Sequence, residues 1–251
     1  MADAIIGVVG KGGTGKTTIT YLLSRVLSSR DKNVLLIDGD PTMSHLARVV
    51  GIQNPKTLEK IRLEIIKTVS RGTADEKADL AFNLDRIIDE IIIKKPRFDM
   101  LVMGQPEAPG CFCPSNTLLR DVIENISGRY DVILIDCEAG LEQIHRKVIR
   151  SISHLIIVSD KSVRSLLTAQ KIVSSANKYT SGKDYYLILN RVSEIEEEIL
   201  QKHIEAVEVK GIHRLRELNR LAELEIKGKS LEKFSDESVF KEIESFLDSV
   251  F

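Results

Sequence analysis

The sequence predicts an α/β fold, with a mostly parallel central sheet and helices on both of its faces. Short apolar runs alternate with helix-like segments along the chain, the order that parallel strands and their crossover helices produce. Most of these runs are continuous rather than alternating, as expected of strands covered on both faces. No repeat, low-complexity tract or linker divides the 251 residues, so residues 1–251 are expected to form a single domain.

Six short apolar runs are predicted to be strands: residues 4–9, 34–37, 100–103, 132–135, 155–158 and 186–189. A weaker strand is expected near residues 206–209. Helices are expected at residues 16–29, 114–125, 142–151 and 163–178. Pro114 suits a first helical turn because its missing N–H would have no partner there. Ser193 and Glu196 form a capping-box pattern that opens a further helix.

Two further stretches, residues 56–95 and 236–251, are predicted to be helical from their charged and apolar residues. Residues 56–95 are highly charged and are expected to form two helices that cover one flank. Residues 236–251 place their apolar side chains on one helical stripe: Val239, Phe240, Ile243, Phe246, Leu247 and Val250. The opposite face is acidic and would be repelled by anionic lipid, so this helix is expected to pack against the core.

The composition limits the classes of function. The formal net charge is −1, so no overall basic field favours nucleic acid as a partner. No apolar run is long enough to span a bilayer. The first residues lack the pattern of a signal peptide, and the three cysteines are expected to be thiols in a reducing compartment. A cytoplasmic protein with neither membrane nor nucleic acid as partner is expected.

A glycine-rich loop follows the first predicted strand and fits the pattern G-x-x-x-x-G-K-[ST]. Glycines let backbone N–H groups converge on an anion, and the next helix directs its positive end towards it. Lys16 is expected to reach the β- and γ-phosphates of ATP, and the Thr17 hydroxyl to bind Mg²⁺. The predicted residues for binding ATP or ADP in this loop are Gly10, Lys11, Gly12, Gly13, Thr14, Gly15, Lys16, Thr17 and Thr18.

The same glycines also fit G-x-G-x-x-G, with Asp38 near the place of the ribose-binding acid of a dinucleotide fold. That alternative gives no role to Lys16 or Thr17. It also leaves Asp136 unexplained, which ends the apolar run at residues 132–135. A P-loop protein uses such a distant strand-end carboxylate to hold Mg²⁺ through water. The loop and the second acid together favour a P-loop nucleoside triphosphatase.

Residues 11–18, KGGTGKTT, contain a second lysine directly after the first glycine. In this they resemble the deviant Walker A motif of the MinD/ParA/nitrogenase iron protein ATPases. Residues 38–41, DGDP, resemble switch I of that family, and residues 136–140, DCEAG, resemble its switch II. The resemblance implies a P-loop ATPase in which two subunits clamp two ATP molecules face to face.

The resemblance also implies a catalytic set of Lys11, Lys16 and Asp40. Lys11 would reach the nucleotide of the partner subunit, which couples hydrolysis to closure of a homodimer. Asp40 would orient the attacking water. The implied magnesium site consists of Thr17, Asp40 and Asp136.

Further roles follow from the same resemblance. Gly140 would sense the γ-phosphate through its backbone, and the implied switch residues are Asp38, Asp40, Asp136, Glu138 and Gly140. Asn190 stands where the family has an asparagine that reads the edge of adenine, for which an amide is suited because it both donates and accepts. Residues 228–231 resemble the late loop that lies beside the base in that family.

Two cysteines lie one residue apart in the segment 110–114, GCFCP, just before a predicted helix. A helix N-terminus favours the thiolate and hence metal binding. Two copies related by a twofold axis would place four thiolates around one zinc-like ion. A site for Ni²⁺ or Zn²⁺ at Cys111 and Cys113 is therefore expected, with buried packing residues or a redox-active pair as alternatives. Cys137 is expected to be a packing residue.

Residues 105–114, QPEAPGCFCP, resemble the distinctive loop of the CooC-type accessory ATPases, which help to insert nickel into carbon monoxide dehydrogenase. This resemblance implies an ATP-driven homodimeric metallochaperone with carbon monoxide dehydrogenase as its client. Two other functions stay open at this point. One is an iron–sulfur electron-transfer ATPase resembling the nitrogenase iron protein, and the other is a MinD/ParA-like positioning switch.

Overall fold

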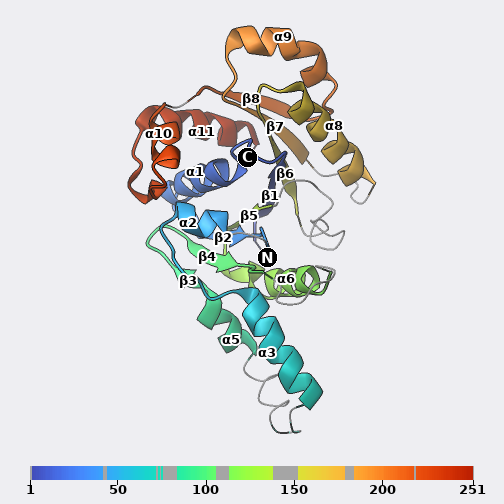
Figure 1. Ribbon diagram of the computed structural model, residues 1–251, viewed down its shortest axis with the longest axis vertical. Coiled ribbons are helices and arrows are strands. Elements are labelled where there is room, and N and C mark those ends of the chain that lie inside the picture. The colour runs from blue at the N-terminus through green and yellow to red at the C-terminus, as the bar shows by residue number, and fades with distance from the viewer. Residues whose placement is uncertain are drawn as a thin grey trace.

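The computed structural model describes residues 2–41, 44–71, 73, 75, 84–105, 113–137, 152–178, 184–217 and 219–250. Its sheet has eight strands in the order β3-β4-β2-β5-β1-β6-β7-β8 (Figure 1). The strands are β1 Ala4–Gly10, β2 Val34–Asp38, β3 Ile93–Lys94, β4 Asp99–Val102, β5 Val132–Asp136, β6 His154–Ser159, β7 Asp184–Asn190 and β8 Gly211–Leu215. Only the β3–β4 pair is antiparallel among these strands. The predicted α/β fold with a mostly parallel sheet is confirmed.

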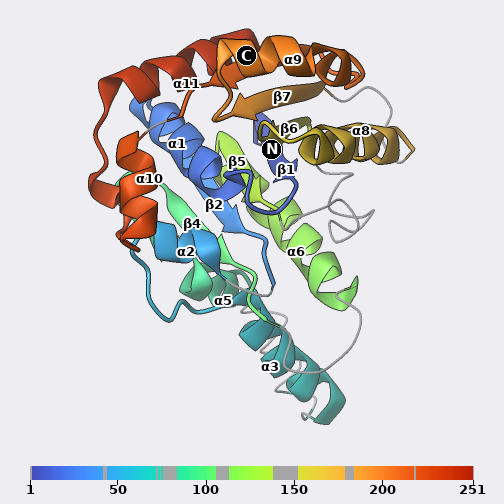
Figure 2. The same cartoon turned by 45° about the horizontal axis from the view of Figure 1, so that its top comes forward.

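Helices cover both faces of the sheet (Figures 1 and 2). One face carries α1 Lys16–Ser29, α2 His45–Val49, α10 Asn219–Ile226 and α11 Glu237–Val250, together with the 3₁₀ turn η2 Leu231–Lys233. The other face carries α3 Leu58–Arg71, α5 Leu84–Ile91, α6 Cys113–Ile126, α8 Val163–Asn177 and α9 Glu194–Glu205. The turn η1 Ser127–Arg129 follows α6 directly.

Two strands near the centre of the sheet, β2 and β5, are buried along their whole length. Every residue of β2 and of β5 is buried. Alternate residues of β2 enter the two cores: Leu35 and Ile37 pack on one side, and Val34 and Leu36 on the other. Because both faces exclude water, such strands need apolar residues at every position. This explains why the strands of the sequence are continuous apolar runs.

Most of the predicted elements are confirmed, but one strand prediction is wrong. Residues 206–209 do not form a strand: α9 ends at Glu205, and the strand follows at Gly211–Leu215. Among the described strands, β8 lies at the edge of the sheet and pairs with β7 alone. Its Ile212 side chain is exposed. A strand of this kind lacks the continuous apolar run of a central strand.

The charged segment 56–95 contains two described helices, α3 and α5, as expected, and also the short edge strand β3, which was not predicted. The capping box of α9 is confirmed, with Ser193 and Glu196 each accepting from the other's backbone N–H. The helix expected at residues 142–151 lies outside the described residues.

The last described helix, α11, packs against the core as predicted. Val239, Ile243, Phe246 and Leu247 are buried, and α11 contacts α1. Burial of each large apolar side chain contributes about 1.5–3 kcal/mol. This contribution holds α11 on the sheet beside the helix that follows the glycine-rich loop.

Candidate nucleotide-binding site

The glycine-rich loop joins the carboxyl end of β1 to the first turn of α1. Gly10 (φ 150°), Gly13 (φ 82°) and Gly15 (φ 95°) all have positive φ angles. A Cβ atom on Gly10 would lie 2.2 Å from the Val158 carbonyl oxygen, and one on Gly15 would lie 2.4 Å from the Asn190 Nδ2 atom. Glycine is therefore required at both positions, sterically as well as by backbone conformation. Such backbone turns direct N–H groups into a concave anion site.

The loop is closed by hydrogen bonds to the Lys11 carbonyl oxygen. It accepts hydrogen bonds from the Thr14 hydroxyl at 2.9 Å and from the Lys16 Nζ at 3.2 Å. The Lys16 side chain is largely buried, and the residue is 9% exposed. The ammonium group is thus held inside the curl of the loop, where a bound phosphate group would meet it.

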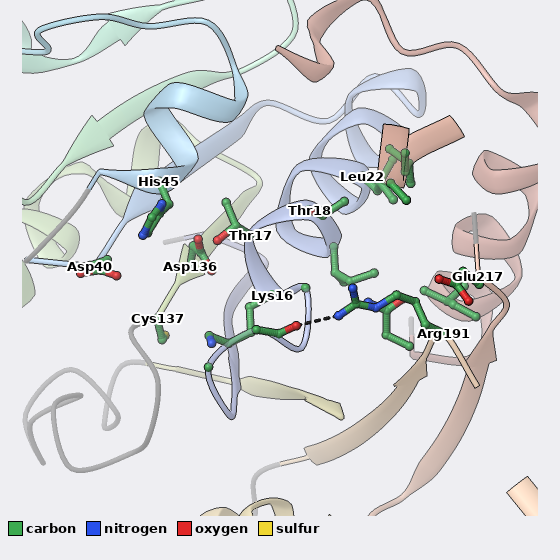
Figure 3. Close-up of a pocket in the computed structure, with 18 of the residues that line it drawn as sticks. Lys16, Thr17, Thr18, Leu22, Asp40, His45, Asp136, Cys137, Arg191 and Glu217 are labelled. Carbon is green, nitrogen blue, oxygen red and sulfur yellow. Dashed lines mark hydrogen bonds between the residues drawn. The ribbon is translucent and has the colours of Figure 1, made fainter. Parts of the chain in front are cut away.

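A cavity of about 420 Å³ opens over this loop (Figure 3). It brings together residues that follow or end five strands, β1, β2, β5, β7 and β8, which are far apart in the sequence. The sequence-predicted residues that line it are Gly12, Gly13, Gly15, Lys16, Thr17, Thr18, Asp40, Asp136 and Asn190. The carboxyl ends of parallel strands on either side of a topological switch point are the usual place for a ligand.

Asp136 ends β5 and is the buried carboxylate of the cavity. The residue is 3% exposed, and its Oδ1 has no hydrogen-bond partner among the described residues. The Thr17 side chain hydrogen-bonds to the carboxylate, and Lys16 lies near enough to act on its charge. Burial nevertheless raises the pKa of Asp136 to about 7. A hydroxyl and a buried carboxylate oxygen without a partner fit a hard divalent cation such as Mg²⁺.

Asp38 lies beside Asp136 in the sheet register but has a different environment. It is completely buried, and its carboxylate accepts hydrogen bonds from the backbone N–H of Ala47 at 3.0 Å and of Asp40 at 3.4 Å. Burial raises the pKa of Asp38 to about 7. Asp40, not Asp38, lines the cavity. Asp38 therefore anchors the segment that carries Asp40 and the start of α2.

The carboxyl end of β7 binds the outer side of the loop. The Asn190 Nδ2 donates to the Thr14 carbonyl oxygen at 2.8 Å. The Arg191 guanidinium donates to the Gly13 carbonyl oxygen at 2.6 Å, the dashed line in Figure 3. The role of Asn190 in reading adenine stays a prediction; its contact in the structure is with the loop backbone. Arg191 was not singled out from the sequence, because a strand-end arginine has no local pattern that marks it.

Several other lining residues were also missed. His45 and Cys137 line the cavity on the side of Asp40 and Asp136 (Figure 3). Other lining residues are Leu215, Arg216, Glu217, Leu221 and Ala222. These residues end or follow β8, whose position in the sequence was predicted wrongly. Gly228 and Ser230, expected beside the base, instead line a separate hollow of about 850 Å³. Cys137 is buried, as expected of a packing residue.

Some predicted site residues lie outside the described residues: Cys111, Glu138 and Gly140. Cys113 is the first residue of α6, and its side chain is not described. Within the described part of the chain, no three His, Cys, Asp or Glu side chains lie close enough together to hold a metal ion. The helices that the structure describes include none with the length and apolar character to cross a membrane.

Comparison with known proteins identifies relatives over the full length of the chain. The family model AAA_31, described as an AAA domain, matches residues 3–189. An uncharacterized ATP-binding protein of Methanocaldococcus jannaschii, MJ0685, is 34% identical over 248 residues, which cover 98% of each chain. The carbon monoxide dehydrogenase accessory protein CooC of Rhodospirillum rubrum is 31% identical over 212 residues, or 76% of this chain and 80% of CooC.

Solved structures show the same architecture. The septum site-determining protein MinD of Pyrococcus horikoshii, in complex with Mg-ADP, superposes with a TM-score of 0.72 over 100% of this chain and 97% of its own, at 24% identity. A ParA family ATPase of Chlorobium tepidum has a TM-score of 0.72 over 98% of both chains, at 21% identity. The chain belongs to the AAA_31 family and is a P-loop ATPase with the fold of MinD and ParA.

Proposed function

We propose that this protein is an ATP-driven homodimeric metallochaperone of the CooC type, which supports nickel insertion into carbon monoxide dehydrogenase in the cytoplasm. The observation that carries the nucleotide part of the proposal is the convergence of Lys16, Thr17, Asp40 and Asp136 on one cavity. Phosphoryl transfer requires mainly positioning and charge neutralisation. These four side chains can provide both.

The residues of the cavity have separate tasks in this proposal. Lys16 and the backbone N–H groups of the loop hold the phosphates of ATP. Thr17 and Asp136 hold Mg²⁺, which supplies neutralisation of the charge that develops on the phosphates. Asp40, on the segment anchored by Asp38, orients the water that attacks the γ-phosphate. The buried Oδ1 of Asp136, which has no hydrogen-bond partner among the described residues, supports the assignment of Asp136 to Mg²⁺.

The homodimer in this proposal rests on Lys11. Lys11 and its neighbours Gly12 and Gly13 are at least partly exposed on the loop, and the Lys11 carbonyl is already used within the loop by Thr14 and Lys16. The partial exposure of Lys11 supports a role for its side chain outside its own subunit. Delivery of a cation to a partner's nucleotide couples hydrolysis to association of the two subunits.

The metal part of the proposal rests on the sequence 110–114 and on the CooC relative. Cys113 begins α6, so a thiolate pair would lie at the start of this 14-residue helix, which favours the deprotonated, metal-binding form. Two subunits would supply four thiolates to one Ni²⁺ or Zn²⁺ ion. Nucleotide can drive metal release only through different affinities for the two dimer states.

Metal titration tests this part directly. Wild-type protein is expected to bind one Ni²⁺ or Zn²⁺ per two chains, and the double variant Cys111→Ser/Cys113→Ser is expected to lose this binding. Cys137→Ser is the matched control: Cys137 is buried, so its loss should leave the stoichiometry unchanged. Metal binding by the double variant equal to that of the wild type would refute the metallochaperone function.

A MinD-like positioning switch is the second candidate, supported by the fold and by a relative, the MinD of Bacillus subtilis, at 24% identity over 196 residues. Such a switch would act on a surface. The apolar stripe of α11 is packed against the core, which favours the first proposal. ATP-dependent co-sedimentation with anionic lipid vesicles would favour the second.

A further inference from the structure

His45 is a cavity residue that no motif accounts for. It is the first residue of α2 and lines the same cavity as Lys16, Asp40 and Asp136. In Figure 3 its imidazole ring points from α2 into the space beside Asp136 and Asp40. Arg191 lies on the opposite side of the cavity in the same view. The ring is therefore at the end of the cavity where the proposed site would hold the phosphates.

The backbone that carries His45 is firmly held. Leu46 and Ala47, the next two residues, are completely buried. The Ala47 backbone N–H donates to the buried Asp38 carboxylate at 3.0 Å. A side chain at a position fixed in this way can make a hydrogen bond at little cost in conformational entropy, because its backbone is already ordered.

From its position, His45 could contact only one phosphate group of a bound ATP, the γ-phosphate. In the nucleotide site proposed above, the loop and Lys16 would enclose the β-phosphate, and Thr17 and Asp136 would hold the cation. The third phosphate of a bound nucleotide would extend from there towards the segment of Asp40 and α2. Among the described residues of that segment that line the cavity, Asp40 is an acceptor and His45 is the side chain with an N–H donor.

We propose that His45 binds the γ-phosphate of ATP and so makes the protein distinguish ATP from ADP. The inference rests on the nucleotide site proposed above. It assigns to His45 a contact that ATP can make and ADP cannot. Hydrogen bonds to charged groups are among the stronger ones, so the contact would raise affinity for ATP alone.

Binding measurements with two nucleotides test the proposal. Calorimetric titrations with Mg-ADP and with the non-hydrolysable analogue Mg-AMPPNP are compared for wild type, His45→Ala, His45→Gln and Arg48→Ala. Glutamine keeps an N–H donor at a similar reach. Arg48 lies on the same short helix but lines the separate hollow of about 850 Å³, so Arg48→Ala controls for disturbance of α2.

His45→Ala is expected to lower the affinity for AMPPNP by about tenfold or more, while the affinity for ADP stays within about twofold. His45→Gln should retain most of the AMPPNP affinity, and Arg48→Ala should match wild type. Equal losses for both nucleotides, or no loss, in His45→Ala would overturn the role of His45 alone. Failure of the wild type to bind either nucleotide would overturn the nucleotide site as well.

Discussion

Asp38 and Asp136 are both buried carboxylates at the ends of strands, but their hydrogen-bond environments differ. They are partners in the register of β2 and β5, and both lie almost without solvent exposure. Asp38 is satisfied by two backbone N–H groups, whereas one oxygen of Asp136 has no partner among the described residues. The first carboxylate thus has a structural environment, and the second has the environment of a cation ligand.

The raised pKa values predict how stability depends on pH. Burial raises the pKa of both carboxyls from 3.8 to about 7. Between these values the unfolded chain releases protons that the folded chain keeps, so the folded state loses stability as pH rises from about 4 to about 7. The melting temperature without nucleotide or divalent cation should therefore be lower at pH 7.5 than at pH 5.5.

Asp38→Asn tests the origin of this dependence. Asparagine cannot ionise, so the variant should show a shallower fall of melting temperature over the same interval. The remaining fall should come largely from Asp136, and addition of Mg-ADP should oppose it by binding the ionised carboxylate. A melting temperature that rises with pH between 5.5 and 7.5 in the wild type would contradict the raised pKa values.

The elements of the fold were predictable where burial determines the pattern. The helix at residues 16–29 has the bounds that the sequence predicts. The six predicted strands up to β7 are present, although β4 ends at Val102, one residue before the predicted end at Met103. β8 was placed about five residues too early, because an edge strand needs no continuous apolar run. The wall of the cavity that follows β8 was missed for the same reason.

The loop between β1 and α1 requires glycine more strictly at Gly10 than at Gly13. A Cβ on Gly10 would collide with the backbone oxygen of Val158 on the neighbouring strand β6, whereas a Cβ on Gly13 would meet no atom within 4 Å. Gly10→Ala is therefore expected to reduce the free energy of unfolding by about 2–4 kcal/mol. Gly13→Ala should reduce it by about 1 kcal/mol, from its positive φ alone.

Urea-induced unfolding of the two variants measures this difference. Wild type and both variants are compared at the same pH, without nucleotide, so that only the loop geometry differs. A Gly10→Ala variant as stable as Gly13→Ala would mean that β6 does not constrain the loop as the structure describes.

For the whole molecule, the sequence pattern was sufficient to predict the fold and those site residues that the pattern itself marks. Lys16 and Thr17 belong to a motif of fixed spacing, and Asp136 is marked by the apolar run that it ends. The parallel sheet brings these residues together. His45 and Arg191 carry no such motif; they reach the cavity through the anchoring of α2 and the left-handed turn at Arg191 (φ 61°). Tertiary contacts of this kind cannot be read from local sequence.

The proposed sharing of the site between two subunits also concerns the whole molecule. Within the cavity of one subunit, Lys16 is the lysine that lines the wall among the described residues, while Lys11 does not line it. The proposal that Lys11 completes the site of a second subunit therefore makes association and hydrolysis depend on the same side chain. Binding of nucleotide to one subunit is expected to depend on Lys16 instead.

Light scattering of metal-free protein with Mg-ADP and with Mg-AMPPNP tests this claim most directly, in wild type, Lys11→Ala and Lys16→Ala. Wild type is expected to have the mass of one chain with ADP and of two chains with AMPPNP. Lys11→Ala should bind AMPPNP but keep the mass of one chain, and Lys16→Ala should lose nucleotide binding. A wild-type mass that is the same with both nucleotides, or full dimerisation of Lys11→Ala, would contradict the account.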